Sequence, residues 1–62
     1  MLIIFISLKT NKSLATEVNL KPYNLEDELV IDGTHYIVAE YNIKNNKQQV
    51  YLKEMNKESV PE

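Results

Sequence analysis

Sixty-two residues with a formal net charge of −2 describe a small, mildly acidic chain without cysteine. The length allows one domain, and the lack of cysteine excludes disulfides, thiolate metal sites and thiol catalysis. All seven basic residues are lysine, so the guanidinium fork that reads guanine edges is missing and a strongly basic, phosphate-binding surface is not expected.

The first apolar run, Leu2 to Leu8, is rich in β-branched and aromatic residues and predicts a buried strand. No basic residue precedes the run and Lys9 follows it, so we do not expect a signal peptide. The run is also far shorter than the ~20 apolar residues of a membrane-spanning helix. We therefore expect a cytoplasmic protein with no membrane partner.

Residues 13–20 are open to two interpretations. Apolar and polar side chains alternate from Leu14 to Leu20, which is typical of a half-buried strand. A loop over residues 11–13 would place this strand beside the first one and set Leu8, Ile6 and Ile4 opposite Thr16, Val18 and Leu20 on one apolar face. The alternative is a short helix over residues 13–20 with Ser13 as its N-cap.

Residues 21–24 predict a connector, because Pro22 disfavours both a continuing helix and a central strand. Asn24 is expected to cap a single helical turn over residues 25–27, whose acidic side chains would lie near the positive end of the turn.

Two dipeptides predict a three-stranded meander. Asp32-Gly33 is a strong signal for a two-residue hairpin turn, and it pairs Val30 with His35 and Leu29 with Tyr36. A second turn at Asn45-Asn46 pairs Tyr41 with Val50, Glu40 with Tyr51 and Ala39 with Leu52. The long strand from Thr34 to Ile43 is shared by both hairpins.

This register divides the meander into two apolar faces. The better core face consists of Val30, His35, Ile37, Ala39, Tyr41, Ile43, Val50 and Leu52. The other face consists of Leu29, Ile31, Tyr36, Val38 and Tyr51, among Glu40, Gln49 and Lys53. The second face is too apolar for an ordinary wet surface, so it is expected to be covered by the N-terminal hairpin or by a partner.

The fold predicted from these patterns is all-β, a small SH3-like barrel of about five short antiparallel strands. A single β domain over residues 1–55 is followed by a flexible polar tail at residues 56–62, where the alternation is lost. The alternative is α+β, with the short helix at residues 13–20 packed on the three-stranded meander.

Catalytic chemistry is poorly represented. His35, the only histidine, is expected to be an ordinary strand residue, because no second ligand, nucleophile or orienting acid accompanies it at a workable spacing. A single glycine excludes glycine-rich phosphate loops. We expect no enzymatic activity, no catalytic or metal-binding residues and no cofactor.

The best functional expectation is a non-enzymatic protein-binding module that occupies a surface of a partner protein. Tyrosine is common in binding hot spots, and the predicted surface consists of Tyr36, Val38, Glu40 and Tyr51, with an acidic rim of Glu26, Asp27 and Glu28. Small size and a composition that suits an AT-rich genome favour an inhibitor or adaptor encoded by a phage or another mobile element.

Two alternatives belong to other functional classes. The tyrosines could stack nucleobases on a small nucleic-acid-binding barrel, although the lysines are too sparse for a convincing phosphate track. Otherwise the first strand, Leu2 to Leu8, could pair with its own copy and build a homodimer or a larger structural assembly, because an apolar edge strand favours pairing.

Overall fold

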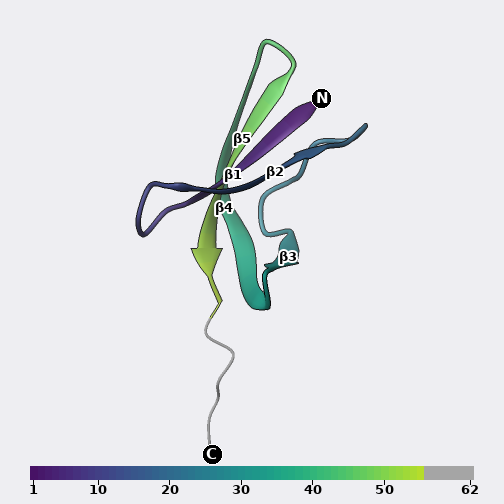
Figure 1. The fold of residues 1–62 in the computed structure, drawn as a ribbon. Helices are drawn as coiled ribbons and strands as arrows, with labels where there is room; N and C mark the ends of the chain where they lie inside the picture. The colour runs from purple at the N-terminus through teal and green to yellow at the C-terminus, as the bar shows by residue number, and fades with distance from the viewer. Residues whose placement is uncertain (56–62) are drawn as a thin grey trace, which may run out of the picture.

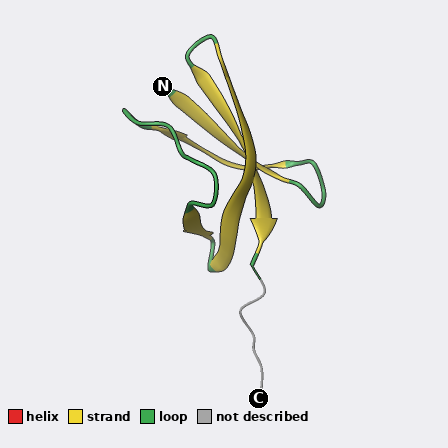
Figure 2. Cartoon of the chain, turned by 180° about the vertical axis from the view of Figure 1, so that it is seen from behind, coloured by secondary structure: helices red, strands yellow, loops and turns green. Residues whose placement is uncertain are grey.

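A computed structural model describes residues 1–55 as five strands in one mixed sheet, and residues 56–62, predicted as a tail, lie outside the described part. The strands are β1 (Leu2–Ser7), β2 (Ser13–Val18), β3 (Glu28–Ile31), β4 (Thr34–Lys44) and β5 (Lys47–Glu54). The sheet curls into a half-barrel (Figure 1). The all-β, barrel-like prediction is confirmed, and the helix at residues 13–20 is wrong because β2 occupies that segment (Figure 2).

The strand order, β2-β1-β5-β4-β3, places the first and last strands side by side at the centre of the sheet. β1 runs parallel to β5, with Leu2 beside Lys47 and Ile6 beside Tyr51. The prediction of antiparallel strands throughout is therefore wrong for this pair, while the three other strand pairs are antiparallel. The remaining edges of the sheet belong to β2 and β3.

The two meander turns form where the sequence predicts them. Asp32 and Gly33 have φ angles of 52° and 83°, and Asn45 and Asn46 have φ angles of 53° and 63°. Positive φ at both central residues defines the tight hairpin turn that matches the twist of the flanking strands. The resulting pairs between β3 and β4 are those expected from the sequence.

A bulge in β4 changes which side chains face the core. The predicted pairing with β5 holds from Lys44 to Glu40, and then the register shifts, so that Val38 lies opposite Leu52 and Ala39 has no partner. One extra residue reverses the direction of every side chain before it. Both predicted meander faces are therefore wrong: Leu29, Ile31, Tyr36 and Val38 pack with Val50 and Leu52, while Val30 and His35 are exposed and Ile37 shares the outer face with Lys53.

The predicted register of the N-terminal hairpin is wrong by four residues. Ile4 lies opposite Thr16 and Leu2 opposite Val18, with a register shift after Phe5. Because the error is an even number, the side chains still divide between the two faces as expected. The buried side chains of β1 are nevertheless Ile3 and Phe5, on the opposite face from Ile4 and Ile6.

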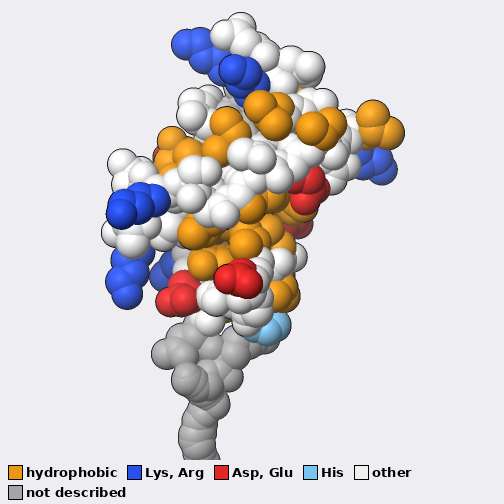
Figure 3. All heavy atoms as spheres, in the orientation of Figure 1, with side chains coloured by type: hydrophobic (Ala, Val, Ile, Leu, Met, Phe, Trp, Pro, Cys, Tyr) orange, Lys and Arg blue, Asp and Glu red, His pale blue; other side chains and the backbone are white. Residues whose placement is uncertain are grey.

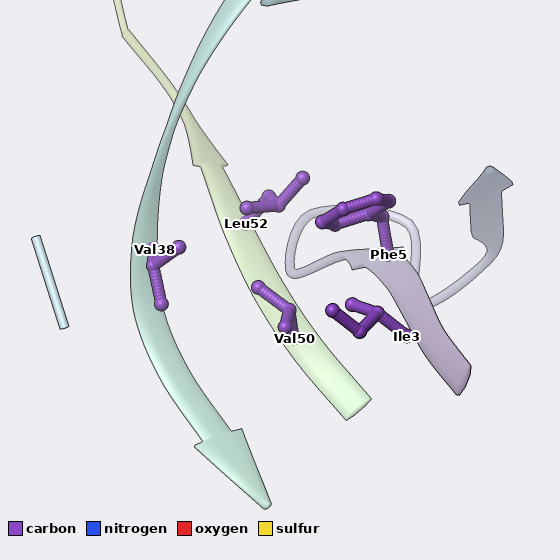
Figure 4. Close-up of a cluster of buried hydrophobic side chains, with 5 residues drawn as sticks. All are labelled: Ile3, Phe5, Val38, Val50 and Leu52. Atoms are coloured by element: carbon purple, nitrogen blue, oxygen red, sulfur yellow. The ribbon is translucent and has the colours of Figure 1, made fainter. Parts of the chain in front are cut away.

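The hydrophobic core lies on the inner face of the half-barrel and consists of five side chains from the three central strands: Ile3, Phe5, Val38, Val50 and Leu52. Figure 4 shows these side chains converging from β1, β5 and β4. Each is at most 3% exposed. Burying such a small set gives limited hydrophobic stabilisation, as expected for a domain of this size.

The connector between β2 and β3 completes the core. The ring of Tyr23 meets Phe5 edge to face, with ring centroids 5.2 Å apart. Gln48, which is fully buried on β5, accepts a hydrogen bond from the Tyr23 N–H and donates one to the Tyr23 carbonyl, both at 2.8 Å. This paired contact satisfies the buried amide and fixes the connector on the inner face.

The helical turn predicted at residues 25–27 does not form. The Asp27 N–H donates to the Asn24 carbonyl across a tight turn, and the Asp27 carboxylate accepts a hydrogen bond from the Asn24 N–H at 2.8 Å. Asp27, not Asn24, is thus the residue whose side chain stabilises the turn. Glu26 has a φ of 69° there, a left-handed conformation that a Glu side chain disfavours.

Candidate functional site

The structure divides the predicted binding surface between the two faces of the sheet. Val38 is 1% exposed in the core and Tyr36 packs against that core from the inner face. Glu40 and Tyr51 lie opposite each other on the outer face, after the bulge at Ala39. The structure therefore brings together two of the four predicted residues and separates them from the other two.

The predicted acidic rim lies at the start of β3. Glu26 is exposed, and its N–H donates to the Val38 carbonyl at 2.9 Å. Asp27 is half-buried and uses its carboxylate to hold the turn to Asn24. Glu28 is exposed at the start of β3, opposite Ile37. These acids lie at one edge of the sheet, two strands away from Tyr51.

The outer face carries a continuous group of half-buried apolar side chains, which we call the outer patch: Leu2, Ile4, Ile6, Ile37 and Tyr51. Alternation along β1 places its three members in one row, and the parallel register sets Ile6 beside Tyr51. The connector packs on the inner face through Phe5. The outer patch therefore receives no cover from the connector.

Charged and polar side chains surround the outer patch. Lys47 is beside Leu2, Gln49 beside Ile4, and Glu40 across from Tyr51. A hollow of about 260 Å³ at one end of the patch is lined by Ile4, Gln49 and the β4–β5 turn. In the view of Figure 3, hydrophobic side chains gather across the middle of the molecule and lysines lie at its margins. An apolar centre with a polar rim is the usual composition of a protein interface.

A second recess opens where the β1–β2 turn meets the ends of β4 and β5. This groove has a volume of about 810 Å³, and its apolar lining comes from Leu8, Leu14 and Tyr36. Lys9 and Lys53 contribute positive charge at its margins. Tyr36 thus lines the groove and takes no part in the outer patch.

The four tyrosines have different environments. Tyr23 packs in the connector, Tyr36 on the inner face and Tyr51 in the outer patch, while Tyr41 is 38% exposed near the far end of β4. They do not form one stacking surface. The tyrosine arrangement therefore gives no support to the nucleic-acid alternative, whose aromatic side chains would need to follow one another along a groove.

The ionisation of the Tyr23 phenol is perturbed by its surroundings. Its hydroxyl donates to the Glu17 carboxylate at 3.2 Å. Partial burial raises the pKa of the Tyr23 phenol above its usual value, and the negative charge of Glu17 raises this pKa further. A phenol that is held protonated beside a carboxylate serves as a structural hydrogen-bond donor, not as a base.

His35 lies on the exposed side of β4, opposite Val30. Within residues 1–55, no three His, Asp, Glu or Cys side chains are grouped so that they would hold a metal ion. In the same part of the chain no helix is long and apolar enough to cross a membrane.

Four members of the outer patch, Leu2, Ile4, Ile6 and Ile37, are absent from the predicted binding surface. A signal for the first three is present in the sequence, because both faces of LIIFI are apolar and only one can face the core of a single sheet. Ile37 gave no such signal, because its direction depends on the bulge at Ala39.

Comparison of the chain with known protein families, with curated proteins and with solved structures finds no match. The functional conclusion therefore depends on the geometry alone.

Proposed function

We propose that this protein is a non-enzymatic binding module that docks its outer patch on a surface of a partner protein, as a small inhibitor or adaptor does. The observation that carries this proposal is the outer patch itself. Five large apolar side chains lie side by side on a face that the connector does not cover. Contiguous apolar surface of this kind marks interaction sites in small soluble proteins.

The composition of the outer patch favours a protein as the partner. Tyr51 offers a large, rigid contact area with few rotatable bonds. Three isoleucines of the outer patch share its face, Ile4 and Ile6 on β1 and Ile37 on β4. Lys47 and Glu40 provide charges of both signs at the rim. A rim of mixed sign suits a polar protein surface better than a uniformly negative phosphate backbone.

The experiment compares partner capture by matched variants. Immobilised wild-type protein is used to capture partners, and a double variant, Ile4→Ser with Tyr51→Ala, is expected to lose the partner that the wild type retains. Tyr41→Ala is the matched control, because Tyr41 is also partly exposed but faces the other side of the sheet. NMR amide spectra of the variants that match the wild-type spectrum establish that the variants are folded.

Two results would contradict the proposal. If the outer-patch variant captures the same protein as the wild type, the outer patch is not the binding surface. If Tyr41→Ala loses the partner as completely as the double variant, the effect is not specific to the outer face.

A further inference from the structure

The outer edge of β2 has unpaired backbone groups. Among the five described strands, β2 pairs only with β1. The Asn19 N–H donates to the Met1 carbonyl at 3.0 Å, and because backbone groups alternate in direction along a strand, Thr16 and Val18 turn their N–H and C=O groups away from β1. No backbone hydrogen bond from another part of residues 1–55 reaches these two residues.

β3 has a free edge of the same kind. The Val38 N–H donates to the Asp27 carbonyl at 2.9 Å, so Asp27 and Leu29 face β4 while Glu28 and Val30 turn their backbone groups outward. Within the described chain no strand covers this edge. The half-barrel therefore ends in two strands that can each accept one more strand.

β2 has few of the features that usually protect an edge strand. Its single charged residue, Glu17, accepts hydrogen bonds from the Tyr23 hydroxyl at 3.2 Å and from the Asn19 side chain at 2.9 Å. Val18 is 80% exposed, and Leu20 just after the strand is 95% exposed. Natural edge strands are normally blocked by outward charges, proline or a covering segment.

The two edges carry opposite charge. Exposed lysines flank β2 on both sides, Lys9 and Lys12 before it and Lys21 after it. Four acids lie in β3 or directly next to it: Glu26, Asp27, Glu28 and Asp32. Residues 26–40 contain five acids and no lysine. An edge strand with basic flanks and an edge strand with acidic flanks are complementary between copies of one chain.

We propose that β2 of one copy pairs antiparallel with β3 of a second copy, so that this protein self-associates head to tail through its sheet edges. The proposal uses the edges and not the outer patch, so it goes beyond the proposed function and does not depend on it. Pairing two copies of β2 would bring lysines together, and pairing two copies of β3 would bring acids together. Only the mixed pairing joins unlike charges.

The outward-facing residues define the register. Thr16 lies opposite Val30 of the second copy, and Val18 opposite Glu28, so that each pair exchanges backbone hydrogen bonds. In this register Lys21 of one copy approaches Glu26 of the other, and Lys12 approaches Asp32. The outer faces of the two sheets become continuous. The first strand cannot provide the predicted self-pairing, because β2 and β5 already occupy both edges of β1.

The first test measures molar mass over a wide concentration range at low salt. The wild type is expected to gain mass with concentration and to lose the added mass in high salt. A Lys12→Glu, Lys21→Glu variant and a Glu26→Lys, Asp32→Lys variant are each expected to remain monomeric. Their equimolar mixture is expected to associate again, because both exchanged edges are complementary.

The second test uses the absence of native cysteine. Thr16→Cys and Val30→Cys are made in separate chains and oxidised alone and together. A disulfide is expected only in the mixture, because only then do the two cysteines lie opposite each other. Val18→Cys mixed with Val30→Cys is the register control and is expected to react less.

Three outcomes would overturn the proposal: a wild type that is monomeric at every concentration, association that the charge reversals do not change, or a Thr16→Cys chain that links to itself. The last result would indicate pairing of two β2 strands. Each of these outcomes leaves the outer-patch proposal standing, because the capture experiment uses residues outside both edges.

Discussion

The two faces of the sheet contain similar apolar side chains and have very different environments. On the inner face, Ile3 and Phe5 are almost completely buried beneath the connector. On the outer face, their neighbours Leu2, Ile4 and Ile6 remain half-buried. The difference comes from one nine-residue segment of chain, residues 19–27, and the residue types alone do not determine which face is covered.

This comparison shows why a chain of this size leaves apolar surface open. Residues 1–55 include one connector long enough to cross a face, and Gln48 fixes that connector on the inner side through two hydrogen bonds to Tyr23. The other connections described are short turns at the ends of strands. A sheet with two apolar faces and one cover therefore has one face available for a partner.

The largest expected effect comes from adjacent isoleucines on β1. Ile3→Ala removes a fully buried side chain and should lower the free energy of unfolding by about 2–5 kcal/mol, enough to unfold much of so small a domain. Ile4→Ala, one position along the strand, should cost about 1 kcal/mol or less because its side chain is already partly in water. Urea denaturation measures both values, and equal losses would contradict the assignment of the two faces.

An intermediate effect is expected from the contact that holds the connector. Gln48→Leu keeps the side-chain size but leaves the Tyr23 N–H and carbonyl without their partner, so stability should fall by about 1–3 kcal/mol. Gln49→Leu, on the outer face, is the control and should change stability by less than about 0.5 kcal/mol. Thermal unfolding measures the stability of both variants, and a larger loss for the Gln48 variant than for the Gln49 variant shows that the Gln48 amide holds the connector.

The smallest expected effect is the ionisation of Tyr23. Because its folded pKa is raised above its unfolded value, the contribution of Tyr23 to stability is complete below pH 10 and is lost as pH rises through the folded pKa. Glu17→Gln should lower this pKa by removing a charge while keeping a hydrogen-bond acceptor. Tyrosinate absorbance, with Tyr23→Phe used to assign the signal, measures the change; an unaltered titration would remove Glu17 as a cause.

Local turn chemistry made much of the meander predictable. Asp32-Gly33 and Asn45-Asn46 adopt positive φ easily, and these turns set the pairing of β3 with β4 and of β4 with β5 as far as Glu40. The outer patch was harder to predict, because the place of Ile37 in it depends on one unpaired residue, Ala39. No residue type there signals a bulge, and the bulge moved Val38 from a predicted surface into the core.

Contacts between distant segments were also beyond sequence patterns. The parallel pairing of β1 with β5 is set by the whole sheet, because a segment's own alternation carries no information about its neighbour. The hydrogen-bonded contact between Tyr23 and Gln48 depends on where the connector crosses the sheet. By contrast, the existence of β1 and β2 followed from their apolar patterns, and the structure confirms both strands.

The central position of β1 has a consequence for biosynthesis. Leu2 pairs with Lys47 and Ser7 with Leu52, so β1 finds the hydrogen bonds of one edge only after β5, four strands later in the chain, has been synthesised. Until then β1 can pair with β2 alone, and topologies with such distant pairings fold slowly. The centre of this sheet is therefore expected to assemble last, after the hairpin of β1 and β2 and after the meander of β3, β4 and β5.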